Sequence, residues 1–401
     1  MKSTVKFCAA VAMFAFAAPA FAGGVLTNNS SLTDILVEKG VLTQADVKAI
    51  SKDNDGKLKF EAMFYLNNYY QNAKTTTATT ATSTKTTGLA VDRAYFTAKY
   101  SFNDDWMMRF TGDVGREANL GKQQNFYLKY AYVEGKLAGK AAVLRVGQSH
   151  TPWIDYEQGL WKHRYVAKVT SDQYGFDTSA DLGMGLKGKL MDGKLGYFAT
   201  VTNGTGYGSG SRSTTGRDLS ARIGFYPING LTLDVQYYNG YKGTKTSLTK
   251  GVQSKFYQAM VSYKVGDFRI GANYLNNKDT AKGANNSTIH DGNVTGTYRT
   301  AAVGDKSDST GYSLWTTGKL GGGFGAFGRY EKLDNKFTNA AGVANTLKEK
   351  VTRFVGGVEY TVIKGIDFSL AYDRTELKNQ GNVATNKRTD DRFGLYSRVK
   401  F

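Results

Sequence analysis

From residue 57 to the end of the chain, apolar and polar residues alternate one by one. In the stretch KLKFEAMFYLNNYY, which begins at residue 57, Leu58, Phe60 and Phe64 are apolar, and Lys59 and Glu61 fall between them. A period of two indicates a β-strand, because successive side chains of a strand point to opposite faces. The pattern predicts sixteen strands, near 57–71, 90–101, 105–116, 123–136, 140–149, 179–190, 194–203, 217–227, 231–240, 253–265, 268–277, 310–320, 324–335, 351–362, 366–376 and 390–401.

The predicted strands are long, and their connections alternate strictly between short and long. Most strands have about 10 to 13 residues, close to the ~9–11 that a tilted strand needs to cross a bilayer. Seven connections are tight turns rich in Gly, Asn and Asp, such as MDG at 191–193 and ING at 228–230. Eight are longer and lie near 72–89, 117–122, 150–178, 204–216, 241–252, 278–309, 336–350 and 377–389. This arrangement predicts an even-stranded up-and-down barrel with both chain ends on the short-turn side.

Aromatic residues gather at the ends of the predicted strands, as they do at the two interfaces of a membrane barrel. The residues near short turns are Phe102, Trp106, Phe225, Phe268, Phe324 and Tyr360, and those near long loops are Tyr70, Tyr238, Tyr274 and Tyr312. A soluble β-protein does not need sixteen long hairpin strands with loops so unequal at its two ends. We therefore predict an all-β fold, a 16-stranded antiparallel transmembrane β-barrel over 57–401.

The front of the chain has a different character. Residues 1–22 combine a charged start, an apolar run too short to span a bilayer and the small-residue site AFA, which together predict a cleaved signal peptide. Residues 23–56 contain two short helical patterns with capping-box-like starts. We interpret them as a periplasmic helical appendage, with a partly ordered leader as the alternative.

Composition narrows the function classes. The single cysteine, Cys8, lies in the signal peptide, so a mature chain has neither a disulfide nor a thiolate metal site. The mean hydropathy of −0.41 does not argue against a membrane barrel, because lipid-facing and lumen-facing residues average to a polar value. The formal charge of +18 suggests anionic partners. Export makes nucleic acid the least expected of these, which leaves outer-membrane lipid and small anionic solutes.

Sixteen strands are enough to enclose an aqueous lumen. The phase of the alternation places basic residues on its wall, and the pore-lining set is Arg93, Arg109, Lys129, Arg145, Lys187, Arg222, Arg329 and Arg353. The expected pore-lining acids are Glu61, Asp113, Asp234 and Glu359. A wall biased towards arginine predicts a weak preference for anions. The alternative is that these arginines pair with the wall acids and only hold the barrel rigid.

Two stretches resemble a known family. LRVGQSHTPWIDYE at 144–157 and VDRAYFTAKYSFNDDWMMRFTGD at 91–113 are similar to segments of the phosphate-selective porin O/P family, and the layout resembles Gram-negative general porins. At 153–157 the chain reads WIDYE where that family continues Phe-Gly-x-Glu. The resemblance implies an outer-membrane homotrimer of sixteen-stranded barrels that takes up small anionic solutes, phosphate among them. It also implies that the third long loop folds inward and narrows the channel.

That third loop, 150–178, has a composition of its own. Pro152 stiffens its start, and Trp153, Tyr156, Trp161 and Tyr165 are suited to packing against a wall. The stretch DYEQGLWKHRY is compatible with a short helix. The charges that we expect at the constriction are Asp155, Glu157, Lys162, His163 and Arg164. Opposed charges there would filter solutes, whereas the alternative is that they pair among themselves at the rim.

Other classes of function have weaker support. The chain has three histidines, at 150, 163 and 290, and no G-x-S-x-G elbow, so we expect neither an enzyme nor a metal site, and no cofactor. An outer-membrane hydrolase is the alternative from the enzyme class. A barrel that sheathes a c-type cytochrome is another, but the chain has no C-x-x-C-H, so any haem would belong to a partner.

Overall fold

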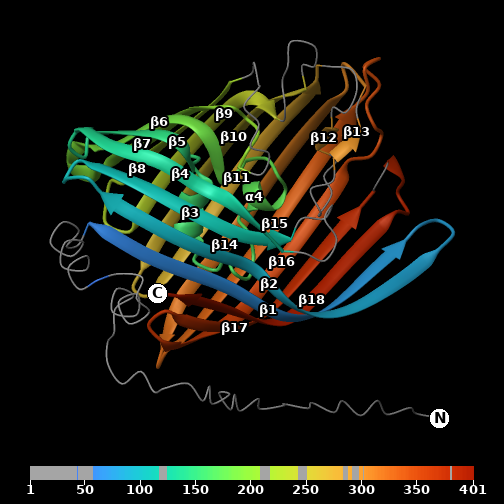
Figure 1. Cartoon of the computed structure of the whole chain (residues 1–401). Helices are drawn as coiled ribbons and strands as arrows, with labels where there is room; N and C mark the ends of the chain where they lie inside the picture. Colours follow the sequence, from blue (N-terminus) through green and yellow to red (C-terminus); the bar gives the residue numbers. More distant parts are fainter. Residues whose placement is uncertain are drawn as a thin grey trace. The chain divides into compact units, whose positions relative to one another are not determined.

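The computed structural model describes residue 43 and residues 57–116, 124–207, 217–242, 251–282, 288–290, 298–300, 302–379 and 382–401. Sixteen strands form one closed antiparallel barrel, in which the last strand pairs with the first (Figure 1). The barrel strands are β1 (Leu58–Thr76), β2 (Ala81–Ser101), β3 (Trp106–Arg116), β4 (Gln124–Ala138), β5 (Ala142–His150), β6 (Ala180–Leu190), β7 (Leu195–Thr202), β8 (Asp218–Phe225), β9 (Leu231–Lys242), β10 (Val252–Val265), β11 (Phe268–Ala281), β14 (Lys306–Gly321), β15 (Phe324–Thr338), β16 (Glu349–Ile363), β17 (Ile366–Lys378) and β18 (Lys387–Lys400). The predicted fold class and all sixteen predicted strands are confirmed.

The largest difference from the prediction is at 72–89, which was expected to be a long loop. There β1 and β2 continue as a hairpin as far as the pair Thr76 and Ala81. The hairpin turn is closed by a hydrogen bond from the Thr77 backbone N–H to the Thr80 carbonyl, at 2.8 Å. The segment is rich in threonine, which is β-branched and favours strands, so its polar composition did not indicate a loop. Two further short strands, β12 (Thr288–His290) and β13 (Tyr298–Thr300), lie within the predicted loop 278–309.

Alternation gives the wall one apolar and one polar face. Large apolar side chains such as Phe60, Ile270 and Leu314 are exposed on the outside, whereas their sequence neighbours face the interior. Tyr238 corrects the expected aromatic girdle: it is buried and its hydroxyl donates to Asp218, whereas Tyr237 is exposed. Because Tyr237 and Tyr238 are adjacent, the alternation is compatible with either of them facing outward, and the prediction chose the wrong tyrosine.

The two ends of the barrel differ as predicted. Leu58 of β1 pairs with Tyr100, beside the short turn that joins β2 to β3, so the barrel begins at its short-turn end. Gly230 and Gly365 close two of the short turns with φ of 85° and 101°, a backbone conformation that side chains with a Cβ rarely adopt. The long connections lie at the opposite end.

The described residues include three short helices: α3 (Ile154–Trp161), α4 (Thr170–Gln173) and the 3₁₀ turn η2 (Met191–Gly193). No helix among the described residues is long and apolar enough to cross a bilayer. The expected signal peptide (1–22) and helical appendage (23–56) lie outside the described residues, apart from Thr43.

Candidate functional site

The loop between β5 and β6, residues 151–179, lies inside the barrel, and we call it the inward loop. Its apolar side chains join residues of β1, β10 and β14 to β18 in one buried cluster, so the loop packs on that continuous arc of the wall. Trp153, Trp161 and Tyr165, expected to pack against a wall, are almost completely buried. The cluster consists of Trp153, Ile154, Trp161, Tyr165, Ala167 and Val169 of the loop with Tyr65, Met260, Trp315, Phe327, Val355, Ala371 and Tyr396 of the wall.

Helix α3 lies near the start of the inward loop, and hydrogen bonds fix both of its ends. The Glu157 backbone N–H donates to the Trp153 carbonyl at 2.9 Å, and the Trp153 indole N–H donates to the Glu157 carboxylate at 2.8 Å. The helix ends at Lys162, whose left-handed backbone (φ 66°) lets its N–H reach the Gln158 carbonyl at 2.8 Å. This is the short helix that the sequence suggested.

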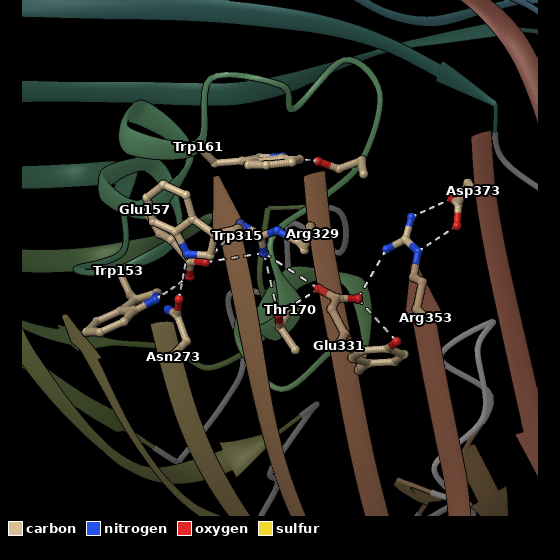
Figure 2. Close-up of polar contacts among 12 residues, drawn as sticks. Trp153, Glu157, Trp161, Thr170, Asn273, Trp315, Arg329, Glu331, Arg353 and Asp373 are labelled. Atoms are coloured by element: carbon tan, nitrogen blue, oxygen red, sulfur yellow. Dashed lines mark hydrogen bonds and ion pairs between the residues drawn. The ribbon is translucent and has the colours of Figure 1, made fainter. Parts of the chain in front are cut away.

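Glu157 is the centre of a buried ionic anchor between the inward loop and the wall (Figure 2). Its Oε1 lies 3.3 Å from Arg329, whose guanidinium is 4.5 Å from the centre of the Trp161 ring. The side chains of Glu157 and Arg329 are 1% and 0% exposed, so this pair is shielded from water. Burial raises the pKa of Glu157 although Arg329 opposes that shift.

The anchor continues along the wall to β17 (Figure 2). Glu331 accepts a hydrogen bond from the Thr170 hydroxyl at 2.7 Å and lies 3.5 Å from Arg353. Arg353 in turn holds Asp373 with two hydrogen bonds of 2.7 and 2.9 Å. Arg329 and Arg353, expected on the pore wall, are therefore buried in contacts around the inward loop.

A second group of contacts holds His163 and Tyr165, which follow helix α3, against the wall. His163 is buried, stacks on Phe327 at 4.0 Å and lies 3.3 Å from the Glu359 carboxylate. The Tyr165 hydroxyl donates to the same carboxylate at 2.5 Å. The expected constriction residue His163 and the expected wall acid Glu359 are thus brought together at a packed contact.

A third group holds the start of the loop against β8 and β9. Arg222 donates to the Pro152 carbonyl at 2.9 Å and to Asp234 at 2.6 Å, and its guanidinium lies 3.7 Å from the centre of the Tyr156 ring. The Tyr156 hydroxyl donates to Asp234 at 2.9 Å. Together, the three groups attach the loop to β8, β9 and β15 to β17.

A cavity of about 710 Å³, which we call the passage, lies between the inward loop and the wall from β1 to β5. Its lining includes Arg109 and His150 from the wall and Asp155 and Arg164 from the loop. Arg109 lies 3.5 Å from His150 and 4.7 Å from the centre of the Tyr130 ring. The Tyr130 hydroxyl donates to Asp155 at 3.0 Å. Charges of both signs therefore face the passage.

Two loop carboxylates respond differently to this interior. Enclosure away from bulk water raises the pKa of Asp155, although Lys129 lowers it in part. Burial also acts on Asp172, but Arg164 at 3.5 Å and Lys168 at 3.7 Å hold its pKa below the usual value. Asp172 is thus a stable anion shared by two cations.

Lys162 lies apart from the other predicted constriction charges. Its side chain is exposed at the surface of the lumen. Partial loss of water contact lowers its pKa, and the positive charges of Lys319, Lys264 and Arg269 lower it further. These three neighbours lie at or near short turns, so Lys162 belongs to the short-turn end of the lumen.

The remaining predicted wall residues also have partners, and most of these partners are other charged side chains of the wall. Arg93 contacts Asp113, Lys99 lies 2.5 Å from Glu61, and Glu134 is shared by Arg145 at 2.5 Å and Lys187 at 2.9 Å. Lys129 donates to the Ser179 hydroxyl, and its ammonium lies 3.3 Å from the centre of the Tyr207 ring. These contacts hold a tyrosine-rich wall in one arrangement.

Sequence reasoning missed several residues that line the passage. Tyr95, Tyr130, His150 and Gln158 line the cavity, and Asp172 fixes Arg164 beside it. The alternation contained a usable signal for Tyr95, which shares the parity of Arg93 on β2. For Gln158 and Asp172 no periodic signal exists, because they lie in the loop. Within the described part of the chain no group of three His, Cys, Asp or Glu residues is arranged to hold a metal ion.

Comparison with known proteins gives a likeness of fold. No protein-family model matches the sequence, and no curated relative matches it. The anion-selective porin from Comamonas acidovorans aligns with a TM-score of 0.57 and 12% identity over 86% of this chain and 99% of that one. The outer membrane channel DcaP of Acinetobacter baumannii aligns with a TM-score of 0.56 and 12% identity, over 86% and 98%. Outer-membrane expressed OmpT of Vibrio cholerae aligns with 0.54 and 15%, over 86% and 97%. The chain therefore has the fold of outer-membrane porins.

Proposed function

We propose that the chain forms a water-filled channel in the outer membrane of a Gram-negative cell, through which small hydrophilic solutes diffuse passively with a preference for anions. The observation that carries this proposal is the cavity between the inward loop and β1 to β5, inside a closed barrel with an apolar outer face. The proposal assigns no catalytic residue and no cofactor.

The preference for anions rests on which charges are neutralised. Most wall arginines contact a wall or loop carboxylate, but the contacts of Arg109 are with His150, Thr111 and the ring of Tyr130. Arg164 shares its carboxylate, Asp172, with Lys168. The passage thus retains positive charge that an entering anion can meet, and guanidinium groups suit carboxylate and phosphate.

Phosphate is one anion that fits this chemistry, in keeping with the resemblance of residues 91–113 and 144–157 to phosphate-selective porins. We also propose a homotrimer as the working assembly. One solved structure of similar fold is described as the trimer form of OmpT of Vibrio cholerae, at 13% identity and a TM-score of 0.53.

The decisive measurement is the conductance and reversal potential of the purified protein in planar bilayers under a salt gradient. We expect open channels with an anion-selective reversal potential, and a shift towards cations in an Arg109→Gln/Arg164→Gln variant. Lys350→Gln, which changes an exposed lysine of β16, is the control and leaves selectivity unchanged. Absence of conductance would contradict the proposed channel, and a cation-selective reversal potential would contradict the proposed preference for anions. Replacing chloride by phosphate ranks the two anions.

A further inference from the structure

A row of charged side chains crosses four neighbouring strands on the outer face of the barrel, at its long-loop end. Lys255 of β10 pairs with Lys278 of β11, Lys278 pairs with Asp308 of β14, and Asp308 pairs with Lys336 of β15. Residues directly opposite each other on adjacent strands share one face of the sheet. With strands ~4.8 Å apart, the row spans about 14 Å.

A second row lies one step nearer the loops on the same face. It contains Lys306, which pairs with Thr280 and Thr338. Lys282 follows two residues after Thr280. With the first row these residues line a shallow cavity of about 600 Å³. We call Lys255, Lys278, Lys282, Lys306 and Lys336, all of them exposed, the lysine cluster.

An aromatic belt lies directly below the lysine cluster on the same outer face. Tyr274 and Tyr312 pair with each other and are both 43% exposed. Tyr257, two residues from Lys255, is also exposed. Tyrosine marks the boundary between the hydrocarbon core and the headgroups of a bilayer. The lysine cluster therefore lies at the level of the headgroups.

Positive charge dominates this patch. Asp308 is the one carboxylate on the outer face of the four paired positions, 3.9 Å from Lys278, and it already accepts a hydrogen bond from Asn276 at 2.9 Å. Asp279 also borders the cavity, but it is buried and accepts a hydrogen bond from Asn277 at 2.9 Å. Asp334 of β15, two residues from Lys336, is a second carboxylate on this outer face. The five lysines of the cluster thus outnumber the two outer-face carboxylates beside them.

We propose that the lysine cluster binds the phosphate groups of a phosphorylated glycolipid in the outer leaflet of the membrane. Ammonium groups bind phosphate as point charges, and the tyrosine belt below them suits the acyl chains of the same molecule. A lipid satisfies both surfaces at once, whereas free phosphate satisfies only the first. The inference rests on the outer-membrane location proposed above, but not on conduction.

The chain offers a matched control at the same end of the barrel. Lys378 of β17 and Lys387 of β18 pair with each other, but both ammonium groups lie close to Glu376, at 2.7 and 2.6 Å. Their charge is therefore locally neutralised. Changing these two lysines removes positive charge from the rim without changing the lysine cluster.

The test measures binding of phosphorylated lipid A to the full chain in detergent micelles by native mass spectrometry. A lysine near an anionic headgroup contributes about a fivefold gain in affinity, so Lys255→Gln/Lys278→Gln/Lys306→Gln should weaken binding about a hundredfold. The Lys378→Gln/Lys387→Gln control should change it less than about twofold. Circular dichroism and heat-modifiable migration verify that each variant is folded.

Three results would overturn the proposal: equal binding by the wild type and the triple variant, equal binding of dephosphorylated lipid A, or an equal loss in the control. Inorganic phosphate at the same concentration should not displace the lipid, and displacement would assign the patch to free phosphate instead. Bilayer conductance of the same variants separates the two proposals. If the protein binds lipid A but does not conduct, only the channel proposal is contradicted. If it conducts but the triple variant binds lipid A as well as the wild type does, only the lipid-site proposal is contradicted.

Discussion

Asp155 and Glu157 are two residues apart on helix α3 and have opposite surroundings. Glu157 turns to the wall and is buried with Arg329, whereas Asp155 lines the open passage beside His150. Both pKa values are raised by burial, but only the titration of Asp155 changes the charge that a solute meets. At the scale of the residue, a carboxylate can therefore affect a passing solute only if its side chain lines the passage.

Asp155 should make the selectivity depend on pH. Because its pKa is raised, it loses its negative charge, as pH falls, at a higher pH than an ordinary aspartate. The passage then becomes more positive, so the preference for anions should increase with acidification. Reversal potentials measured between pH 7 and pH 3, a range of about four units around the carboxyl values, follow this step.

Asp155→Asn isolates the group from its neighbours His150 and Asp172. At every pH the variant should show the anion preference that the wild type reaches in acid, and it should lack the step. If it titrates like the wild type, the change in selectivity comes from another group and the assignment of Asp155 is wrong.

At the scale of the element, the inward loop is held by long-range contacts rather than by its own helix. Helix α3 has 8 residues and α4 has 4, too few to be stable alone in water. Their attachment comes from Arg329, Arg222 and the Glu359 contact with His163. These pairs fix the position of the loop together with its buried apolar cluster.

Glu157→Gln tests this attachment. It removes the loop carboxylate from Arg329, which keeps Glu331 at 3.6 Å as its buried partner. The free energy of unfolding should fall by about 2 kcal/mol, because a buried hydrogen bond between charged groups is lost. Urea titration of the folded barrel measures the loss. The freed loop should also make single-channel current noisier.

Asp155→Asn is the matched control for Glu157→Gln, since it is the same change from carboxylate to amide on the same helix. Its stability should differ from wild type by less than about 1 kcal/mol, because Asp155 forms no buried ion pair with an arginine. Equal losses in the two variants would show that the anchor does not hold the loop.

At the scale of the whole molecule, the barrel turns its apolar side chains outward. Leu314 on β14 and Ile270 on β11 are 57% and 60% exposed, and both lie between the tyrosine belt and the short turns. Exposure of so many large apolar side chains suits hydrocarbon and not water. The proposed membrane location follows from this outer face.

Leu314→Arg tests the location. An arginine facing the middle of a bilayer should destabilise folding into lipid vesicles by about 2–4 kcal/mol. Val343→Arg in the loop between β15 and β16, where the side chain is also exposed, should have an effect near zero. Folding is followed by the change in gel migration on titration with urea. Equal effects at the two positions would contradict a membrane-embedded wall.

The elements could be predicted because their signal is local. A strand needs only the period of two, and a tight turn needs only Gly, Asn or Asp at a few positions. The phase failed at Tyr238 because its neighbour Tyr237 is equally compatible with both faces. The threonine-rich stretch 72–89 failed because polar composition and strand propensity point in different directions.

The sequence by itself determined the barrel, its strands, its two unequal ends and the wall positions of most charges. Only the tertiary structure decided which charges are buried and which face the passage. Glu157 meets Arg329 across 172 positions, and Tyr165 meets Ser369 across 204. No local pattern encodes such pairs, because they depend on how a loop without periodicity packs on a wall that closes only when the last strand meets the first.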